Sequence, residues 1–230
     1  MSEQLVRRSA DGHAFDALRA IPSGDPKGSV VVLHPVYGLT SHMGEVCDRW
    51  AASGYVAVAP ALFDRIGKGL THPYGPDGVE AGSASYAALE EADVLMDVAA
   101  CMDAVGGRRP RVVSGFCEGG TWAWVAAARL PFDAQVNFYG SSVPSRLDLA
   151  PRCPTVMHYG QRDPIVPPVE VDRIRRAHPT VLIHEYADAG HAFCNPEQET
   201  YDARAAAEAW QRSLRFLHRV RVPGPFPFLS

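Results

Sequence analysis

The hydrophobic residues of this chain form two alternating kinds of pattern. Continuous apolar runs are typical of strands that are buried on both faces. Such runs are "GSVVVLHP" at 28–35, "YVAVAPAL" at 55–62, "RPRVVSGF" at 109–116, "AQVNFYG" at 134–140, "CPTVMHYG" at 153–160 and "TVLIHEYA" at 180–187. Each run ends near Gly, Pro or Asp, which favour turns. The sequence therefore predicts six buried strands.

Helical patterns lie between these runs, with apolar residues repeating at close to 3.6 positions. They cover residues 41–53, 85–105, 119–130, 167–178 and 199–220. Strands that alternate with helices predict an α/β fold with a doubly wound, mostly parallel sheet flanked by helices. Because no internal repeat or convincing linker interrupts the pattern, we expect residues 1–230 to form a single domain.

The longest stretch without a clear period is "FDRIGKGLTHPYGPDGVEAGSA" at 63–84. Its five glycines and two prolines argue against regular structure. Long irregular segments within compact domains are often functional. We expect a loop here that acts as a lid or pocket wall, with a simple surface excursion as the alternative.

Composition narrows the choice of function. Hydrophobic residues make up 47% and charged residues 21% of the 230-residue chain, and the formal net charge is −4. The chain has no basic stripe that would indicate nucleic-acid binding. It also has no apolar run of about 18 residues that would predict a membrane span. The N-terminus lacks the apolar run of a signal peptide, so a cytoplasmic location is expected. The composition leaves the oligomeric state open.

Five cysteines are present, an odd number with no disulfide-like spacing and no C-x-x-C pair. We therefore expect free thiols, no metal site and no cofactor. Cys117 stands apart because it lies in "VVSGFCEGG", where a strand pattern changes into a helix pattern. Gly115, Cys117 and Gly119 have the spacing of a nucleophile elbow, with cysteine replacing serine. A thiol at a helix N-terminus is favoured as the thiolate.

An elbow nucleophile needs an acid and then a histidine, each after a later strand. "MHYGQRDPIVP" places Asp163 after the run at 153–160, and "YADAGHAFCNP" places His191 after the run at 180–187. Taken singly, the cysteine could be a buried core residue, the aspartate a turn residue and the histidine a loop residue. Three such residues in the required order predict a Cys-His-Asp triad.

With these motifs the chain resembles the dienelactone hydrolase family of α/β-hydrolases, over roughly residues 30–216. The segments that carry the resemblance are "GYVAVAPALFDR", "GFCEGG", "VNFYG", "GQRDPIVP" and "GHAFCNP". The resemblance implies hydrolysis of a small-molecule ester or enol-lactone by Cys117, His191 and Asp163 through a thioacyl-enzyme. By analogy with the elbow fold, the backbone N–H groups of Val36 and Glu118 would form the oxyanion hole.

Four further residues are candidates for substrate contact. Tyr37, Trp122 and Phe193 adjoin the motifs, although ordinary packing would explain them equally well. Arg65, in the 63–84 stretch, could bind a carboxylate. Two alternatives to a dienelactone hydrolase-like enzyme stay open: a broad carboxylesterase or thioesterase, and a non-catalytic or redox-sensing protein on the same fold.

Two positions depart from the family. Pro35 occupies the place where the family has a glutamate close to the resting thiol, and Asn195 replaces an arginine that holds an anionic substrate. The first departure predicts a resting thiolate–imidazolium pair between Cys117 and His191. The second predicts that neutral esters or lactones are accepted at least as well as a carboxylate-bearing dienelactone. The sequence does not identify the natural substrate.

Overall fold

The structure, a computed structural model, describes residues 1–105 and 109–221, with only the backbone at the last position. These residues belong to two compact units, Met1–Val113 and Ser114–Ser230. The predicted domain of residues 1–230 therefore includes two segments, 106–108 and 222–230, that lie outside the described residues. That the chain is a single domain stays a prediction.

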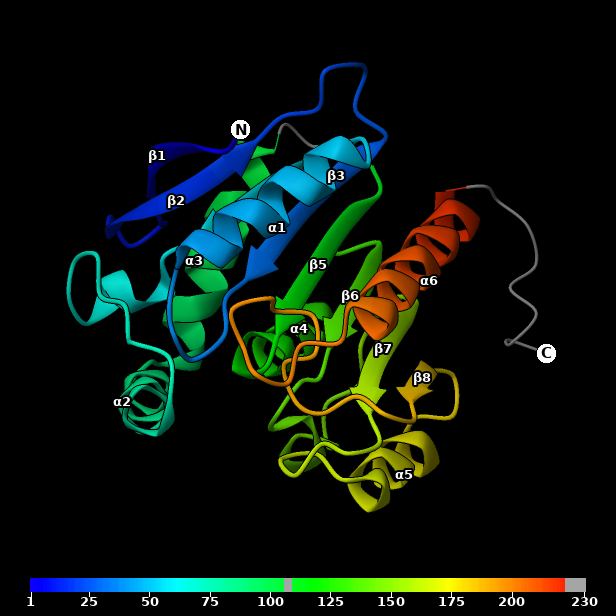
Figure 1. The fold of residues 1–230 in the computed structure, drawn as a ribbon. Helices are drawn as coiled ribbons and strands as arrows, with labels where there is room; N and C mark the ends of the chain where they lie inside the picture. Colours follow the sequence, from blue (N-terminus) through cyan, green and yellow to red (C-terminus); the bar gives the residue numbers. More distant parts are fainter. Residues whose placement is uncertain (106–108, 222–230) are drawn as a thin grey trace. The chain divides into compact units, whose positions relative to one another are not determined.

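The first unit is a mixed sheet with helices on both faces. Its elements are β1 (Glu3–Arg8), β2 (Ala14–Ala20), β3 (Gly28–Leu33), α1 (Ser41–Ala52), β4 (Tyr55–Pro60), the 3-10 turn η1 (Leu62–Arg65), α2 (Pro76–Ala87), α3 (Glu91–Ala104) and the start of β5 (Arg111–Phe116). The order β1-β2-β4-β3 has antiparallel β1/β2 and β2/β4 pairs and a parallel β3/β4 pair. Helices α1 and α3 cover opposite faces of these strands (Figure 1).

The second unit is a parallel sheet. Its elements after β5 are α4 (Glu118–Arg129), β6 (Ala134–Phe138), the 3-10 turn η2 (Val143–Ser145), β7 (Thr155–Gly160), α5 (Pro168–Ala177), β8 (Leu182–Tyr186) and α6 (Ala203–Arg221). The strand order is β5-β6-β7-β8, and the β6/β7 and β7/β8 pairs are parallel. Helix α4 packs behind β6, and α6 packs in front of β6 and β7 (Figure 1). Parallel strands with helices on both faces confirm the predicted α/β class.

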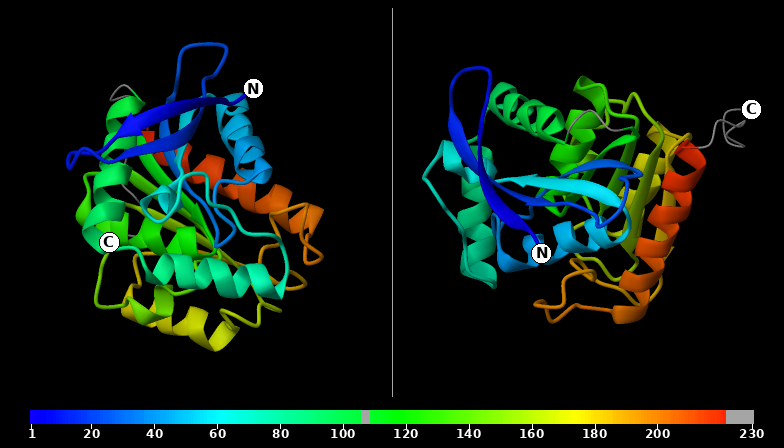
Figure 2. Two further views of the ribbon diagram at one scale, coloured as in Figure 1. Left: turned by 90° about the vertical axis from the view of Figure 1, so that its left-hand side faces the viewer. Right: turned by 90° about the horizontal axis from the view of Figure 1, so that it is seen from above.

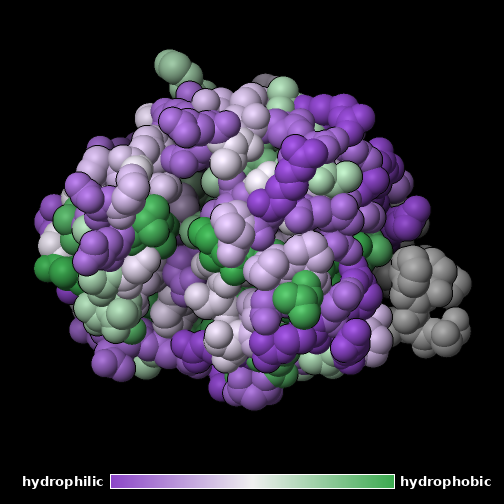
Figure 3. All heavy atoms as spheres, turned by 60° about the horizontal axis from the view of Figure 1, so that its bottom comes forward, coloured by the Kyte–Doolittle hydropathy of each residue, from purple (hydrophilic) through white to green (hydrophobic). Residues whose placement is uncertain are grey.

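Each unit has its own core of large, fully buried side chains. Trp50 and Phe63 are buried in the first unit, and Trp124, Phe138 and Tyr159 in the second. On the face drawn in Figure 3, hydrophobic residues appear as separate islands among hydrophilic ones. Single exposed apolar residues of this kind are normal on a folded protein.

The prediction of an irregular 63–84 segment was wrong over its second half, which begins helix α2. Pro76 occupies the first helical turn, where its missing N–H costs little. A Cβ at Gly78 would lie 1.7 Å from the carbonyl oxygen of Pro73, and one at Gly82 would lie 2.0 Å from that of Val36. These glycines therefore permit close packing of the helix against backbone, and they do not mark a flexible loop. The adjacent 85–105 prediction divides at residues 88–90 into the end of α2 and helix α3.

The N-terminal hairpin of β1 and β2 was not predicted; it is the blue pair of strands in Figure 2. Strand β1 has no fully buried residue, so its sequence lacks the apolar run that identified the other strands. Strand β2 buries Phe15, Ala17 and Ala20 between partly exposed residues. A half-exposed antiparallel strand has alternating apolar and polar residues, and this alternation is difficult to recognise in a short strand.

Candidate active site

Cys117 occupies a strained turn between β5 and α4. Its backbone angles are φ 54° and ψ −124°, a conformation that residues with a Cβ rarely adopt. It is the N-cap residue of α4, and its side chain is largely buried. A Cβ at Gly115 would lie 2.0 Å from the carbonyl oxygen of Gly119, so the turn requires glycine two residues before the cysteine. Backbone strain of this kind is typical of functional sites.

The loop after β6 holds this turn in place. The Cys117 N–H donates to the carbonyl of Phe138 at 3.1 Å, and its own carbonyl accepts from the N–H of Ser141 at 3.2 Å. The buried Asn137 amide donates to the carbonyl of Gly120 at 2.7 Å and accepts from the Gly140 N–H at 3.0 Å. The start of α4 is therefore fixed to the end of β6 by both backbone and side-chain hydrogen bonds.

Asp163 follows β7 and is almost completely buried, at 2% exposed. One of its oxygens, Oδ1, accepts hydrogen bonds from the N–H groups of Ile165 at 2.8 Å and Val166 at 3.0 Å. The other, Oδ2, accepts from Nδ1 of His191 at 2.7 Å. Because both oxygens are engaged, the carboxylate has a fixed orientation and directs the imidazole ring.

His191 follows β8, and its Nε2 is buried without a hydrogen-bond partner of normal geometry among the described residues. Burial lowers the pKa of the imidazole, but the negative charge of Cys117 and the hydrogen bond that the ring donates to Asp163 outweigh it and raise the pKa to about 10. Opposite charges favour the charged form of a titrating group in this way. One nitrogen of the imidazole thus donates a hydrogen bond to the Asp163 carboxylate, and the ring interacts electrostatically with Cys117.

Tyr139 is a residue at the site that the sequence did not reveal. It has a positive φ of 44° and is 2% exposed. Its ring meets the ring of His191 edge-on, with centroids 5.1 Å apart, and that of Phe193 at 5.4 Å. Tyr139 therefore packs against the imidazole of His191. Strain at a residue next to a strand end leaves no signature in composition or period.

Glu118 has a well-defined side-chain environment. Its Oε2 accepts hydrogen bonds from the hydroxyls of Ser141 at 2.6 Å, Ser142 at 2.8 Å and Thr121 at 3.3 Å. The carboxylate thus joins the first turn of α4 to the loop after β6. The oxyanion hole formed by the backbone N–H groups of Glu118 and Val36 stays a prediction.

The predicted substrate contacts differ in their surroundings. Trp122 is buried on α4, and Phe193 is fully buried with its ring between those of Tyr139 and Tyr186. In the first unit, the ring of Tyr37 meets that of Tyr74 edge-on at 4.5 Å. Packing accounts for each of these contacts, and their roles toward substrate stay predictions.

Arg65 is held inside the first unit by carboxylates. Its guanidinium donates to both oxygens of the fully buried Asp97, at 2.7 and 3.0 Å, and to Asp11 at 2.5 Å. Only 10% of its side chain is exposed. These donors are thus engaged by carboxylates of the first unit, and a role for Arg65 in binding a substrate carboxylate stays a prediction.

Among the residues that the structure describes, no helix is both long and apolar enough to cross a bilayer. Within residues 1–105 and 109–221, no cluster of three or more His, Cys, Asp or Glu side chains has an arrangement that could hold a metal ion.

An α/β sheet with a cysteine elbow and an aspartate–histidine pair after later strands defines a hydrolase of the α/β-hydrolase class. The sequence model of the "Dienelactone hydrolase family" matches residues 15–221, and the chain belongs to that family. The chain is 29% identical to the "Carboxymethylenebutenolidase" of Pseudomonas putida over 237 residues, covering 98% of this chain and all of the relative. The protein is thus a carboxymethylenebutenolidase-like hydrolase.

Solved structures agree. A "Putative Dienelactone Hydrolase" from Klebsiella pneumoniae subsp. pneumoniae MGH 78578 matches with a TM-score of 0.83 at 27% identity, over 95% of this chain and 99% of its own. A "Dienelactone Hydrolase-like Promiscuous Phospotriesterase P91" from metagenomic libraries has a TM-score of 0.75 at 20% identity, over 95% and 98%. The second likeness concerns the fold alone.

Proposed function

We propose that this hydrolase cleaves a carboxylic ester or enol-lactone with Cys117 as nucleophile, His191 as acid and base, and Asp163 as the group that orients His191. The observation that carries the proposal is the strained elbow at Cys117 together with the 2.7 Å hydrogen bond between Asp163 and His191. The raised pKa of His191, about 10, supports an imidazolium that faces a thiolate at neutral pH.

The reaction follows from these roles. The Cys117 thiolate attacks the ester carbonyl, and the tetrahedral oxyanion is held by the backbone N–H groups of Glu118 and Val36. The intermediate collapses to a thioacyl-enzyme as the C–O bond breaks, and His191 gives its proton to the leaving oxygen. His191 then takes a proton from water, which attacks the thioester and releases the acid. Asp163 keeps Nδ1 of His191 hydrogen-bonded throughout, so that Nε2 is the nitrogen that exchanges protons.

The substrate class is proposed from the residues around the site. The Pseudomonas putida relative suggests a carboxymethylenebutenolide, which carries a carboxylate. Here Asn195 replaces a cation four positions after His191; it is buried, and its Oδ1 accepts from the N–H of Glu197 at 2.9 Å. An amide contributes no positive charge, so a neutral ester or lactone is favoured at least as much as an anionic one.

The test compares Cys117→Ala with Cys47→Ala, which removes another buried free thiol. With p-nitrophenyl acetate, Cys117→Ala should lose at least about 1000-fold in kcat/KM, because loss of a nucleophile costs orders of magnitude. Cys47→Ala should stay within about tenfold. Residual activity of Cys117→Ala above about a tenth would exclude a nucleophilic role, and labelling of Cys117 without turnover would indicate a sensor.

The same assay measures kcat/KM of the wild-type enzyme for a carboxylate-bearing dienelactone and for its neutral methyl ester. We expect the neutral compound to be hydrolysed at least as well. A preference of more than about tenfold for the anion, about 1.4 kcal/mol, would show that another cation binds the carboxylate and would overturn the substrate proposal while leaving the nucleophile untouched.

A further inference from the structure

A cavity of about 580 Å³ lies within the second unit, away from Asp163 and His191. Its lining includes Thr155 and Leu182, the first residues of β7 and β8. Asp163 and His191 follow the other ends of these parallel strands. A six-residue strand such as β7 spans about 17 Å, so the cavity and the candidate active site lie at opposite ends of the same strands. Its volume is typical of small-molecule sites.

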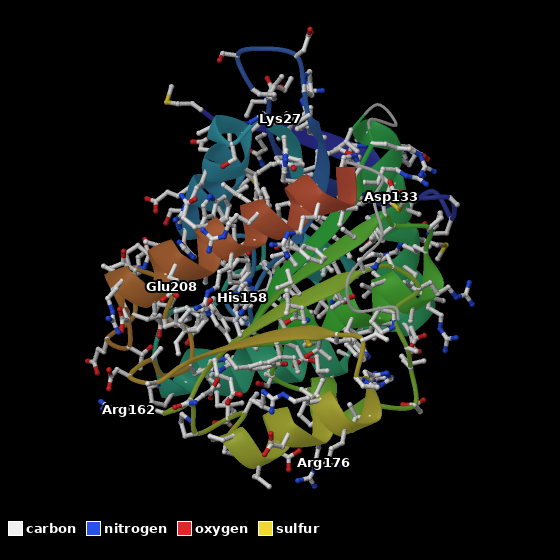
Figure 4. All side chains as sticks on the ribbon, turned by 90° about the vertical axis from the view of Figure 1, so that its right-hand side faces the viewer. Lys27, Asp133, His158, Arg162, Arg176 and Glu208 are labelled. Carbon is white, nitrogen blue, oxygen red and sulfur yellow. The ribbon has the colours of Figure 1, made fainter. Side chains whose placement is uncertain are left out.

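Four arginines surround this cavity: Arg152 from the loop before β7, and Arg212, Arg215 and Arg219 from α6. The spacing of the last three puts them on one side of the helix. Figure 4 shows α6, marked by Glu208, crossing the strand that carries His158. No Asp or Glu is present among the described residues that line the cavity. In a chain with a formal charge of −4, four lining arginines and no lining carboxylate make this a local positive site, although Arg212 pairs with Glu208 outside the lining.

Three of the arginines have guanidinium groups without a partner. Within the part of the chain that the structure describes, the side chains of Arg152, Arg215 and Arg219 make no hydrogen bond or ion pair. By contrast, Arg212 forms an ion pair with Glu208 and lies over the ring of Tyr186, 5.2 Å from its centroid. Arg162 and Arg175, elsewhere in the second unit, also pair with carboxylates. The donors around the cavity are therefore available to a ligand.

The walls between these cations are apolar. Leu182 and Phe216 line the cavity, and Phe216 is only 7% exposed. His184, which also lines it, is neutral at physiological pH, because burial and the nearby positive charge of Arg212 lower its pKa to about 4. A ligand with an apolar body and an anionic head group would therefore be complementary to this cavity in both parts. Guanidinium groups bind carboxylates through paired hydrogen bonds.

We propose that this cavity binds an organic carboxylate with an apolar body, its head group on Arg215 and Arg219 and its chain against Leu182 and Phe216. Solvated surface arginines alone would need no ligand. What distinguishes this group is the combination of unpaired guanidinium groups, a cavity with apolar walls and the absence of acidic lining residues in the described chain. The proposal is independent of the triad and of the hydrolytic reaction.

The test is a calorimetric titration of the full-length protein with sodium decanoate. The double variant Arg215→Gln/Arg219→Gln should bind at least about tenfold more weakly, because hydrogen bonds to charged groups are worth that much or more. The matched control Arg204→Gln/Arg176→Gln removes the same charge from exposed positions outside the cavity and should stay within about threefold. Decanamide, which has the same chain but no charge, should also bind at least about tenfold more weakly than decanoate.

Three results would overturn the proposal. Wild-type protein that binds no decanoate at millimolar concentration has no such site. Equal weakening in the double variant and the control would show only a general charge effect. Purely competitive inhibition of p-nitrophenyl acetate hydrolysis by decanoate, unchanged in the double variant, would assign the binding to the substrate site.

Discussion

Two histidines of this chain, His34 and His191, look alike by position and differ in chemistry. Each comes shortly after a buried strand or strand-end turn, and each is largely enclosed by protein. Yet burial lowers the pKa of His34 to about 4, whereas the charge of Cys117 and the hydrogen bond that His191 donates to Asp163 overcome burial and raise the pKa of His191 to about 10. The difference lies in the partners. At His34 the Pro35 carbonyl and the charge of Asp64 raise the pKa by less than burial lowers it, whereas at His191 Cys117 and Asp163 outweigh burial.

The partners of His34 also define its tautomer. The N–H of Leu62 donates to Nε2 at 3.2 Å, so Nδ1 carries the proton and donates to the carbonyl of Pro35 at 2.8 Å. The Tyr86 hydroxyl donates to the His34 carbonyl at 2.6 Å. A neutral ring with both nitrogens occupied is a structural connector. In contrast, Nε2 of His191 has no hydrogen-bond partner of normal geometry among the described residues, which agrees with its proposed role in proton exchange.

The largest effect that separates these histidines should be on turnover. His191→Ala should lower kcat/KM for p-nitrophenyl acetate by about 100- to 10,000-fold, the range for loss of a general acid–base group. His34→Gln, which can still donate and accept, should stay within about tenfold once the folded fraction is measured by near-UV circular dichroism. An equally severe loss in folded His34→Gln would make the distinction between the two wrong.

A smaller effect should appear in thiol reactivity. With His191 cationic beside it, Cys117 should be alkylated by iodoacetamide at pH 6 nearly as fast as at pH 8.5. In His191→Ala the rate should instead rise with pH as for a free thiol, for which only about 1 in 300 molecules is thiolate at pH 6. Peptide mapping assigns the label to Cys117. A wild-type rate that rises only near pH 8.5 would exclude the resting ion pair.

The comparison also explains what the sequence could predict. Cys117, Asp163 and His191 follow strands in a fixed order, and the β-α alternation that locates strand ends is strong in sequence. Strands β3 to β8 were found for the same reason, although β8 is an edge strand in which only Tyr186 is buried, and not a strand buried on both faces. The order of elements along the chain was therefore enough to propose these three residues as the triad and to favour His191 over His34 as the base, and both stay predictions.

What escaped prediction depends on packing across the fold. Helix α2 uses Gly78 and Gly82 for close contacts with backbone, and the sequence alone cannot distinguish such glycines from those of flexible turns. The positive φ of Tyr139 and its ring contact with His191 arise from the loop after β6. Arg65 looked like a free cation, because its buried partner Asp97 is distant in sequence. Tertiary partners decide each of these cases.

The smallest expected effect is on stability in acid, where the contributions of His34 and His191 to the free energy of unfolding have opposite signs. The folded-state pKa of His34, about 4, lies below the unfolded value of about 6.5. The unfolded chain therefore binds more protons between these values, and His34 costs stability as the pH falls. The raised pKa of His191 stabilises the fold below about pH 6.5, and this contribution is lost only as the pH rises toward about 10.

Between pH 7 and pH 5, linkage through His34 should remove about 2 kcal/mol from the free energy of unfolding. Urea titrations at the two pH values should show that His34→Gln reduces the wild-type difference by about this amount. His218→Gln, which changes an exposed histidine on α6, should leave the difference unchanged. The contrary result would be the same loss of stability in His34→Gln and in wild type between pH 7 and 5. It would mean that His34 is protonated as easily in the folded chain as in the unfolded one. Its hydrogen bonds with Pro35 and Leu62 would then not keep it neutral.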